Sequence, residues 1–282
     1  MSLSIYVSTH KEGFVPTAEP FVPIQVGAAM LNESFCDLKD NTGLNISHKN
    51  KNFCELTAQY WVWKNGKQSD YVGFCHYRRY FDVSRRVQHT LYKKENTIEN
   101  FFEANQQESF ERILEGSDFI VAKPFRYYHS IANTLSTIIQ ADDLAILERV
   151  IEEHFPDYRE AFVFFMYHNN KISSCNMFIT RWELFEQYSK WLFAVLEKVE
   201  LEIKISAYTT PARVFGFLGE ALLNVFLLRN KFRIQEKPLI VFRDDVENDP
   251  DHIFILKEIR RMLSFKFNRP PLSYKMSADN LP

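Results

Sequence analysis

The sequence predicts an α/β fold in which a mostly parallel central sheet is flanked by helices. Short apolar and β-branched runs alternate along the chain with longer stretches of helical periodicity, the order expected when strands are joined through helices. The 282 residues are 46% hydrophobic and 25% charged, so the chain is long and apolar enough to bury a large core.

The first half of the chain supplies most of the predicted strands. Turn residues bound three short apolar runs, which predict strands at 3–10 (LSIYVSTH), 71–77 (YVGFCHY) and 117–124 (SDFIVAKP). The polar, proline-rich residues 11–23 predict a loop. Helical periodicity predicts helices at 53–65 (FCELTAQYWVWKN) and, in a polar stretch, within 84–115.

The second half is mainly helical. Helices are expected at 142–155, which begins with acidic residues, at 182–199, which is rich in aromatic residues, and at 209–230, which begins with threonines and Pro211. Residues 171–181 (KISSCNMFITR) predict one further strand whose first residues are polar.

Composition excludes several classes of protein. The net charge of −2 offers no overall attraction to nucleic acid. Four cysteines lie far apart without a CxxC pair, which argues against a zinc knuckle or a disulfide framework and favours a reducing cytoplasm. The N-terminal MSLSIYVSTHKEGF predicts neither a signal peptide nor an anchor. Glycine-rich nucleotide-binding motifs are also missing, so side chains would have to bind phosphate groups.

Polar residues follow three predicted strands, at the edge where an open α/β sheet binds ligands. The candidate residues in this crevice, which would hold a diphosphate or its sugar, are Thr9, His10, His76, Tyr77, Arg78, Arg79 and Lys123. Arginine can bind phosphate oxygens in a bidentate geometry, while aromatic rings stack on a base or a sugar. An equally favoured alternative is that Arg78 and Arg79 pair with surface carboxylates.

The predicted helix at 209–230 combines apolar residues around most of its circumference with one polar stripe. Arg213, Gly216, Glu220 and Asn224 follow one another at helical spacing. We expect this stripe to line a cavity in which the buried carboxylate of Glu220 accepts a proton or a hydroxyl hydrogen bond, with Arg213 and Asn224 contacting sugar or acceptor. The alternative is a structural salt bridge between Glu220 and an arginine.

Several of these segments together resemble a known family. AQYWVWKN…DYVGFCHYRRYF, the strand CNMFI followed by WLFAVLE, and RVFGFLGEALLNVFL resemble bacterial exopolysaccharide glycosyltransferases that include galactofuranosyltransferases of O-antigen and capsule assembly. The resemblance covers about residues 3–245 and implies a GT-A-like fold and a nucleotide-sugar donor. It differs at Ala221, where relatives commonly carry arginine, and across HSIANTLSTIIQADDL. We therefore expect a GT-A-like domain at 1–245 and a C-terminal extension at 246–282.

The same resemblance raises the question of a metal cofactor. GT-A enzymes usually hold a divalent ion with an Asp-x-Asp at a strand end, whereas the comparable strand here ends in HYRR. We expect arginine to supply the counter-charge, so that no metal is needed. The alternative metal site is Asp249, Asp251 and His252 in an acidic loop. Asn176 is a further candidate for contact with a sugar hydroxyl, or alternatively caps the start of its strand.

The C-terminal residues 257–282 carry an excess of basic residues interleaved with Met262, Leu263, Phe265 and Phe267. Such a segment suits the anionic inner face of the plasma membrane, where a lipid-linked acceptor would lie; the alternative is a disordered tail.

The resulting hypothesis is a cytoplasmic glycosyltransferase that moves a hexose, galactofuranose first, from a UDP-sugar to a lipid-linked or oligosaccharide acceptor of a growing O-antigen or capsular polysaccharide. Two alternatives stay open. One is a transferase that uses UDP-galactopyranose or another UDP-hexose. The other is a non-catalytic module for polysaccharide assembly or sugar binding, which the missing Asp-x-Asp and Ala221 would suit.

Overall fold

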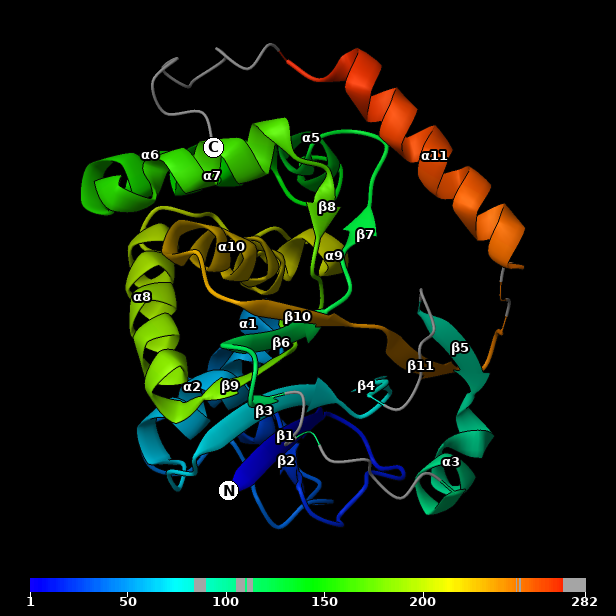
Figure 1. Ribbon diagram of the computed structural model, residues 1–282. Coiled ribbons are helices and arrows are strands. Elements are labelled where there is room, and N and C mark those ends of the chain that lie inside the picture. Colours follow the sequence, from blue (N-terminus) through cyan, green and yellow to red (C-terminus); the bar gives the residue numbers. More distant parts are fainter. Residues whose placement is uncertain (84–89, 105–109, 111–113, 247, 249, 271–282) are drawn as a thin grey trace. The chain divides into compact units, whose positions relative to one another are not determined.

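The computed structural model in Figure 1 describes residues 1–83, 90–104, 110, 114–246, 248 and 250–270. By its contacts the chain divides into two compact units. Unit 1 comprises residues 1–123, 175–189 and 232–248, and unit 2 comprises residues 124–174, 190–231 and 249–282. The domain boundary predicted at residue 245 stays a prediction.

Among the described residues, unit 1 is built on a nine-stranded mixed sheet. Its strands are β1 (Leu3–Thr9), β2 (Phe21–Gln25), β3 (Tyr71–His76), β4 (Arg79–Phe81), β5 (Leu91–Lys94), β6 (Phe119–Ala122), β9 (Phe178–Arg181), β10 (Ile234–Lys237) and β11 (Leu239–Arg243). The order β10-β6-β9-β3-β4-β11-β5 forms the main path, while β1 pairs with β3 and β2 pairs with β1.

The α/β fold class is confirmed, and the sheet is mixed: among the described strands four of the eight pairs are parallel and four are antiparallel. Strand β3 pairs antiparallel with both β4 and β9, and the β6–β9 and β4–β11 pairs are antiparallel too. The tight turn at Tyr77 and Arg78 causes the first reversal, because two residues can join only antiparallel strands. Helical segments accompany the sheet in η1 (Ala28–Met30), η2 (Ser47–Lys49), α1 (Asn50–Phe53), α2 (Leu56–Asn65), η3 (Glu95–Thr97) and α3 (Ile98–Ala104).

The predicted strands match β1, β3 and β6, and their apolar runs form the core. Ile5, Ile120, Ile179 and Ile240 are fully buried and belong to one cluster. Because β6 is buried at all four positions, its apolar run FIVA is continuous and does not alternate.

The expected loop at 11–23 is wrong at its end, where β2 begins at Phe21. This strand pairs in parallel with β1, from Ile5↔Phe21 to Thr9↔Gln25. Pro23 is compatible with it because β1 is the only described strand that pairs with β2, and the isolated bridge on the other side joins Gln25 to Lys39 and does not involve Pro23.

The helix expected within 84–115 is also partly wrong. The residues Leu91–Lys94 form β5, because they pair in parallel with β11 from Ile240↔Leu91 onward. Helix appears at α3, whereas residues 84–89, 105–109 and 111–113 lie outside the described residues.

Unit 2 is mainly helical. Its elements are β7 (Phe125–Arg126), α5 (Ile131–Leu135), α6 (Ala141–His154), η4 (Pro156–Tyr158), α7 (Arg159–His168), β8 (Lys171–Ile172), α9 (Thr209–Ala212), α10 (Val214–Asn230) and α11 (Asp251–Asn268). Helix α7 packs against α5, α6 and α10. Helix α8 (Trp182–Glu200) continues from unit 1 into unit 2. The predicted helices at 142–155 and 182–199 therefore match α6 and α8.

Three predicted elements are interrupted in the structure. The strand predicted at 171–181 divides into β8 and β9, and the two residues before Met177 have positive φ. The helix predicted at 53–65 divides into α1 and α2, because Cys54 has φ 52° and ψ −133°. These two interruptions lie beside the site described next. The third divides the helix predicted at 209–230 into α9 and α10, because Arg213 has φ −80° and ψ 23°.

Candidate active site

The topology brings several predicted site residues to one edge of the unit 1 sheet. Strands β1 and β3 are parallel, and β3 and β6 both run antiparallel to β9. The carboxyl ends of β1, β3 and β6 therefore lie at the same edge as the start of β9. Asn176 precedes β9, so it joins this edge as well.

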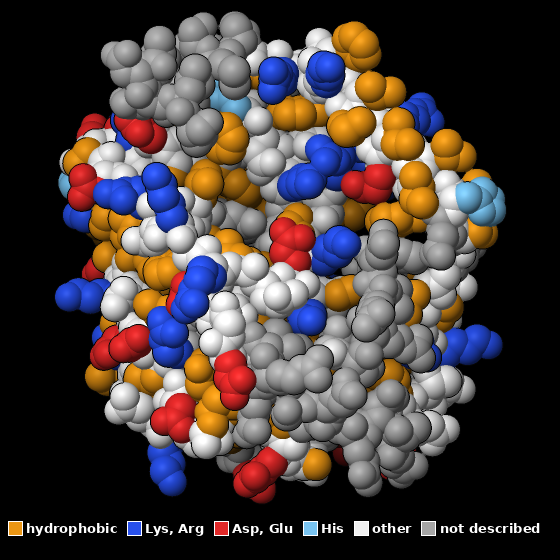
Figure 2. Space-filling view, in the orientation of Figure 1, with side chains coloured by type: hydrophobic (Ala, Val, Ile, Leu, Met, Phe, Trp, Pro, Cys, Tyr) orange, Lys and Arg blue, Asp and Glu red, His pale blue; other side chains and the backbone are white. Residues whose placement is uncertain are grey.

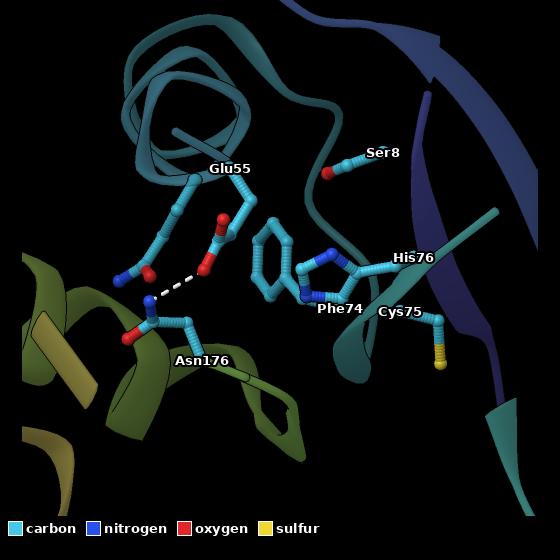
Figure 3. Close-up of a pocket in the computed structure, with 7 residues that line it drawn as sticks. Ser8, Glu55, Phe74, Cys75, His76 and Asn176 are labelled. Atoms are coloured by element: carbon cyan, nitrogen blue, oxygen red, sulfur yellow. Dashed lines mark hydrogen bonds between the residues drawn. The ribbon is translucent and has the colours of Figure 1, made fainter. Parts of the chain in front are cut away.

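Strand register places three of these side chains on one face of the sheet. Ser8 lies beside His76 in the β1–β3 pair, and His76 lies opposite Arg79 in the β3–β4 pair. Laterally paired residues project to the same side of a sheet. On this side a small hollow is lined by Ser8, Glu55, Gln59, Phe74, Cys75, His76 and Asn176 (Figure 3).

A carboxylate and an amide meet in this hollow. The Asn176 Nδ2 donates a hydrogen bond of 2.6 Å to Glu55 Oε1. Glu55 is half-buried and immediately precedes α2, where the helix dipole favours a negative charge. Asn176 is only 2% exposed. The arrangement holds an oriented carboxylate beside a buried amide.

His76 is fixed beside this pair. Its Nε2 lies 2.6 Å from the carbonyl oxygen of Cys175, and because a carbonyl only accepts, Nε2 carries the hydrogen. When the imidazole is neutral, its lone pair is then on Nδ1. Figure 3 shows Ser8, Glu55, His76 and Asn176 pointing toward one another from separate segments, whereas the sulfur of Cys75 points away. Burial raises the pKa of the Cys75 thiol, so that thiol stays protonated.

Backbone strain is concentrated around the hollow. Cys54, Cys175 and Asn176 have φ values of 52°, 72° and 49°, conformations that residues with a side chain rarely adopt. Each costs about 1–3 kcal/mol and persists where the surrounding structure imposes it. The three residues flank or form the contact between Glu55 and Asn176. Such clustering is typical of functional sites.

The two adjacent arginines have different environments. Arg78 lies in the turn and pairs in a bidentate manner with Glu95, through Nε–Oε1 at 3.0 Å and Nη2–Oε2 at 2.6 Å. Lys11 approaches the same carboxylate at 3.7 Å. Arg79 is half-buried on the face of the hollow and makes no ion pair with any other described residue. Arg79 is therefore the better candidate for binding a ligand anion, while Arg78 has the carboxylate partner that the alternative interpretation required.

The other predicted donor-binding residues vary in how accessible their polar groups are. Thr9 is buried and its hydroxyl donates to the Lys11 carbonyl at 2.8 Å, so that hydroxyl stabilises a turn. His10 is exposed and packs edge-on against Tyr77 at 5.2 Å. Lys123 is exposed after β6, which β9 separates from β3 in the sheet.

The polar stripe on α10 belongs to unit 2. Glu220 is half-buried, which corrects the expectation of a buried carboxylate. Asn224 accepts from Ser173 N at 3.0 Å and donates to the carbonyls of Ser173 and Glu220, so both ends of its amide bind backbone. Arg213 is exposed at the start of α10, with its guanidinium 5.5 Å from the Phe217 ring centre. The catalytic and acceptor roles assigned to this stripe stay predictions.

Sequence reasoning missed Glu55, Ser8 and Gln59. The predicted helix began at residue 53, which placed Glu55 in the first turn, where the helix dipole alone explains a carboxylate. No local pattern marks Ser8 or Gln59. Only the β1–β3 register and the start of α2 bring them to the hollow.

Among the described residues, no group of three or more His, Cys, Asp or Glu side chains is arranged to hold a metal ion. Of the alternative metal site, Asp249 lies outside the described residues. Asp251 opens α11 and does not lie in a loop, and His252 is exposed.

Comparison with known proteins identifies the family of this chain. Residues 4–231 match the family described as "Domain of unknown function (DUF4422)". The chain belongs to the DUF4422 family. No curated protein matches it.

A solved structure, described as the apo structure of the bifunctional glycosyltransferase WbbM, is similar to this DUF4422 chain with a TM-score of 0.78 and 28% identity. The match covers 89% of this chain and 48% of the WbbM chain, so the DUF4422 chain spans about half the length of that protein. Together with the helix-flanked mixed sheet, the match establishes a GT-A-like α/β fold.

Proposed function

We propose that this chain is a glycosyltransferase of bacterial polysaccharide biosynthesis and that its active site is the hollow around Glu55. The observation that carries the proposal is the contact between Glu55 and Asn176 at the carboxyl edge of the sheet, beside His76. Ligands of open α/β folds bind at this edge. The similarity to a bifunctional glycosyltransferase at 28% identity supports the same class of reaction.

The hollow supplies the groups that glycosyl transfer needs. An acceptor hydroxyl oxygen bonds to the anomeric carbon of the donor, the bond from that carbon to the diphosphate oxygen breaks, and the hydroxyl proton passes to the Glu55 carboxylate. Asn176 orients that carboxylate through their hydrogen bond. Arg79, on the same face of the sheet as His76, stabilises the charge that develops on the leaving diphosphate.

The donor we propose is a UDP-sugar carrying galactofuranose, with UDP-galactopyranose or another UDP-hexose as the alternative. The acceptor is a lipid-linked or oligosaccharide chain of an O-antigen or capsule. These choices follow from the family resemblance of the HYRRYF and GFLGE segments. Glu220 is the second candidate for the base.

A panel of UDP-sugars tested with synthetic lipid-linked and oligosaccharide acceptors, and read by mass spectrometry, tests this function. We expect one UDP-hexose to give a product one hexose heavier than the acceptor, and UDP to be released in equal amount. If UDP-sugars bind by calorimetry but every donor and acceptor pair fails to give product, the chain is a sugar-binding module and the proposal is wrong.

A further inference from the structure

Helix α11 carries an outward apolar surface. Its large hydrophobic side chains Ile255, Leu256, Ile259, Met262, Leu263 and Phe267, here called the outer stripe, are 53, 60, 43, 44, 43 and 82% exposed. They recur at helical spacing on one side of the helix. Figure 2 shows hydrophobic side chains gathered along α11, at the upper right, with basic side chains among them. Contiguous apolar surface of this kind marks an interaction site.

The opposite side of α11 is attached to its own unit by polar and aromatic contacts. Arg261 lies over the Phe125 ring at 4.4 Å and donates to Glu258 at 3.0 Å. Glu258 also pairs with Arg126 at 3.5 Å, and Phe265 is buried. A surface helix normally packs its apolar side inward, whereas α11 presents its outer stripe outward. Packing within unit 2 therefore does not explain the outer stripe.

The charge beside the outer stripe is positive. Lys257, Arg260, Lys266 and Arg269 are all exposed. In the described residues 253–270 the acidic side chain is Glu258, which already pairs with two arginines. This contrasts with the net charge of −2 of the whole chain. An apolar stripe bordered by cations complements a surface that is apolar inside and anionic outside.

We propose that α11 binds in the plane of an anionic phospholipid surface, with the outer stripe inserted among the acyl chains and Lys257, Arg260, Lys266 and Arg269 at the phosphate groups. A protein partner would supply apolar contacts but has no general need for cations on the border of the helix. Within the described part of the chain no helix is long and apolar enough to cross a membrane, and in-plane binding requires none. The inference does not depend on the proposed function.

Co-sedimentation of the full chain with vesicles tests it. We expect binding to phosphatidylcholine vesicles that contain about a third phosphatidylglycerol, weak binding to pure phosphatidylcholine, and release by salt. The triple variant Ile259→Ser, Leu263→Ser and Phe267→Ser should lower the vesicle partition coefficient at least about tenfold. Arg260→Glu with Lys266→Glu should abolish the preference for anionic lipid.

Control variants change exposed apolar or basic residues elsewhere in the same way. Leu44 and Leu201 are 66 and 83% exposed, so Leu44→Ser with Leu201→Ser should leave binding unchanged, as should Lys51→Glu with Lys67→Glu. Circular dichroism verifies that each variant is folded. The proposal is overturned if the wild-type chain ignores anionic vesicles or if the triple-serine variant binds as well as the wild type. It is also overturned if light scattering shows that the outer stripe is instead covered in a dimer that the triple-serine variant loses.

Discussion

The hollow at the carboxyl edge of the sheet and the polar stripe on α10 each contain a glutamate and an asparagine. In the hollow both residues lie in turns, just before α2 and β9, whereas on α10 both lie within the helix. In the hollow, Asn176 donates to the carboxylate of Glu55, so two side chains hold each other. On α10, Asn224 instead bonds to backbone groups of Ser173 and Glu220. A ligand can replace a contact between two side chains, whereas a side chain that satisfies backbone groups holds the fold together.

Backbone geometry separates the two regions further. Three non-glycine residues with positive φ flank the hollow, Cys54, Cys175 and Asn176, whereas at α10 the one described residue of this kind is Lys231, which ends the helix after the polar stripe. A polar stripe at helical spacing is thus a weak indicator of a site. Convergence of polar side chains from separate segments, on a strained backbone, is a stronger one.

The largest expected effect distinguishes the two glutamates. Glu55→Gln should lower turnover about a hundredfold or more while keeping UDP affinity, because the amide cannot accept the proton of the acceptor. Glu220→Gln is the matched control, a half-buried glutamate of a helix changed in the same way. We expect it to alter turnover much less. Single-turnover rates with both variants measure this, and a larger loss in Glu220→Gln would reverse the assignment in favour of the residue chosen from sequence.

The next effect distinguishes the two arginines. Arg79→Ala should weaken UDP binding and slow turnover, each by about tenfold or more, because no other described residue pairs with its charge. Arg78→Ala should act less on UDP, since its guanidinium already pairs with Glu95. Arg79→Lys should rescue only in part, because a point charge lacks the bidentate geometry.

If arginine and not a metal ion neutralises the charge of the leaving diphosphate, a chelator should leave turnover unchanged. Calorimetry with UDP and rates in the presence of a chelator provide the measurements. Loss of activity on chelation, restored by manganese, would contradict the cationic counter-charge. Equal effects of Arg78→Ala and Arg79→Ala on UDP affinity would remove the distinction between the arginines.

Sequence predicts the parts of this fold that depend on local pattern. The apolar runs of β1, β3 and β6 have turn residues at their ends, which is sufficient to identify them. The sequence of β2 contains Pro23 and is typical of a loop. The strand was missed because its extended conformation depends on pairing with β1. The same holds for β5, which β11 keeps extended within a polar stretch.

The candidate site, like the fold, was predictable only where it depends on local sequence pattern. Strand ends indicated the edge at which the candidate site lies, including His76 and Arg79, because parallel strands present their carboxyl ends together. Glu55 was not predictable, since its contact with Asn176 joins residues 121 positions apart and periodicity describes only neighbours on one element. The pairing of Arg78 with Glu95 likewise depends on how two elements come together.

A smaller effect tests the structural role of the amide on α10. Asn224→Ala removes hydrogen bonds to backbone groups of Ser173 and Glu220, so it should lower the free energy of unfolding by about 1–3 kcal/mol. Turnover per folded molecule should stay within about threefold of wild type. Urea denaturation and active-site titration measure the two quantities. Reduced turnover at unchanged stability would instead support the acceptor contact expected from sequence.

The smallest effect concerns a polar cluster at the opposite edge of the unit 1 sheet, where Asp118 binds two arginines. Its Oδ1 accepts from Arg181 Nη2 and Arg233 Nη2, each at 3.1 Å, and its Oδ2 accepts from the Arg233 backbone N at 2.9 Å. The carboxylate of Asp118 and its donors form hydrogen bonds with one another, as the amide of Asn224 does with backbone groups beside α10. We therefore expect the cluster to affect stability and not turnover. Hydrogen bonding to the Arg233 side chain, with the nearby positive charges, lowers the pKa of Asp118 from 3.8 to about 2.

Because the folded protein favours the ionised carboxylate, the cluster stabilises the fold fully above about pH 4, and this contribution is lost as the pH falls toward 2. Asp118→Asn should therefore lower the melting temperature at pH 7 by about 2–4 °C, and the difference from wild type should shrink between pH 4 and pH 2. Calorimetric scans across this range measure it, with turnover at pH 7 as the second readout. A difference in melting temperature that is independent of pH would mean that packing, and not the charge of Asp118, makes the contribution. A loss of turnover would mean that a cluster whose groups bind one another can still belong to the active site, which would undo the distinction drawn between the hollow and α10.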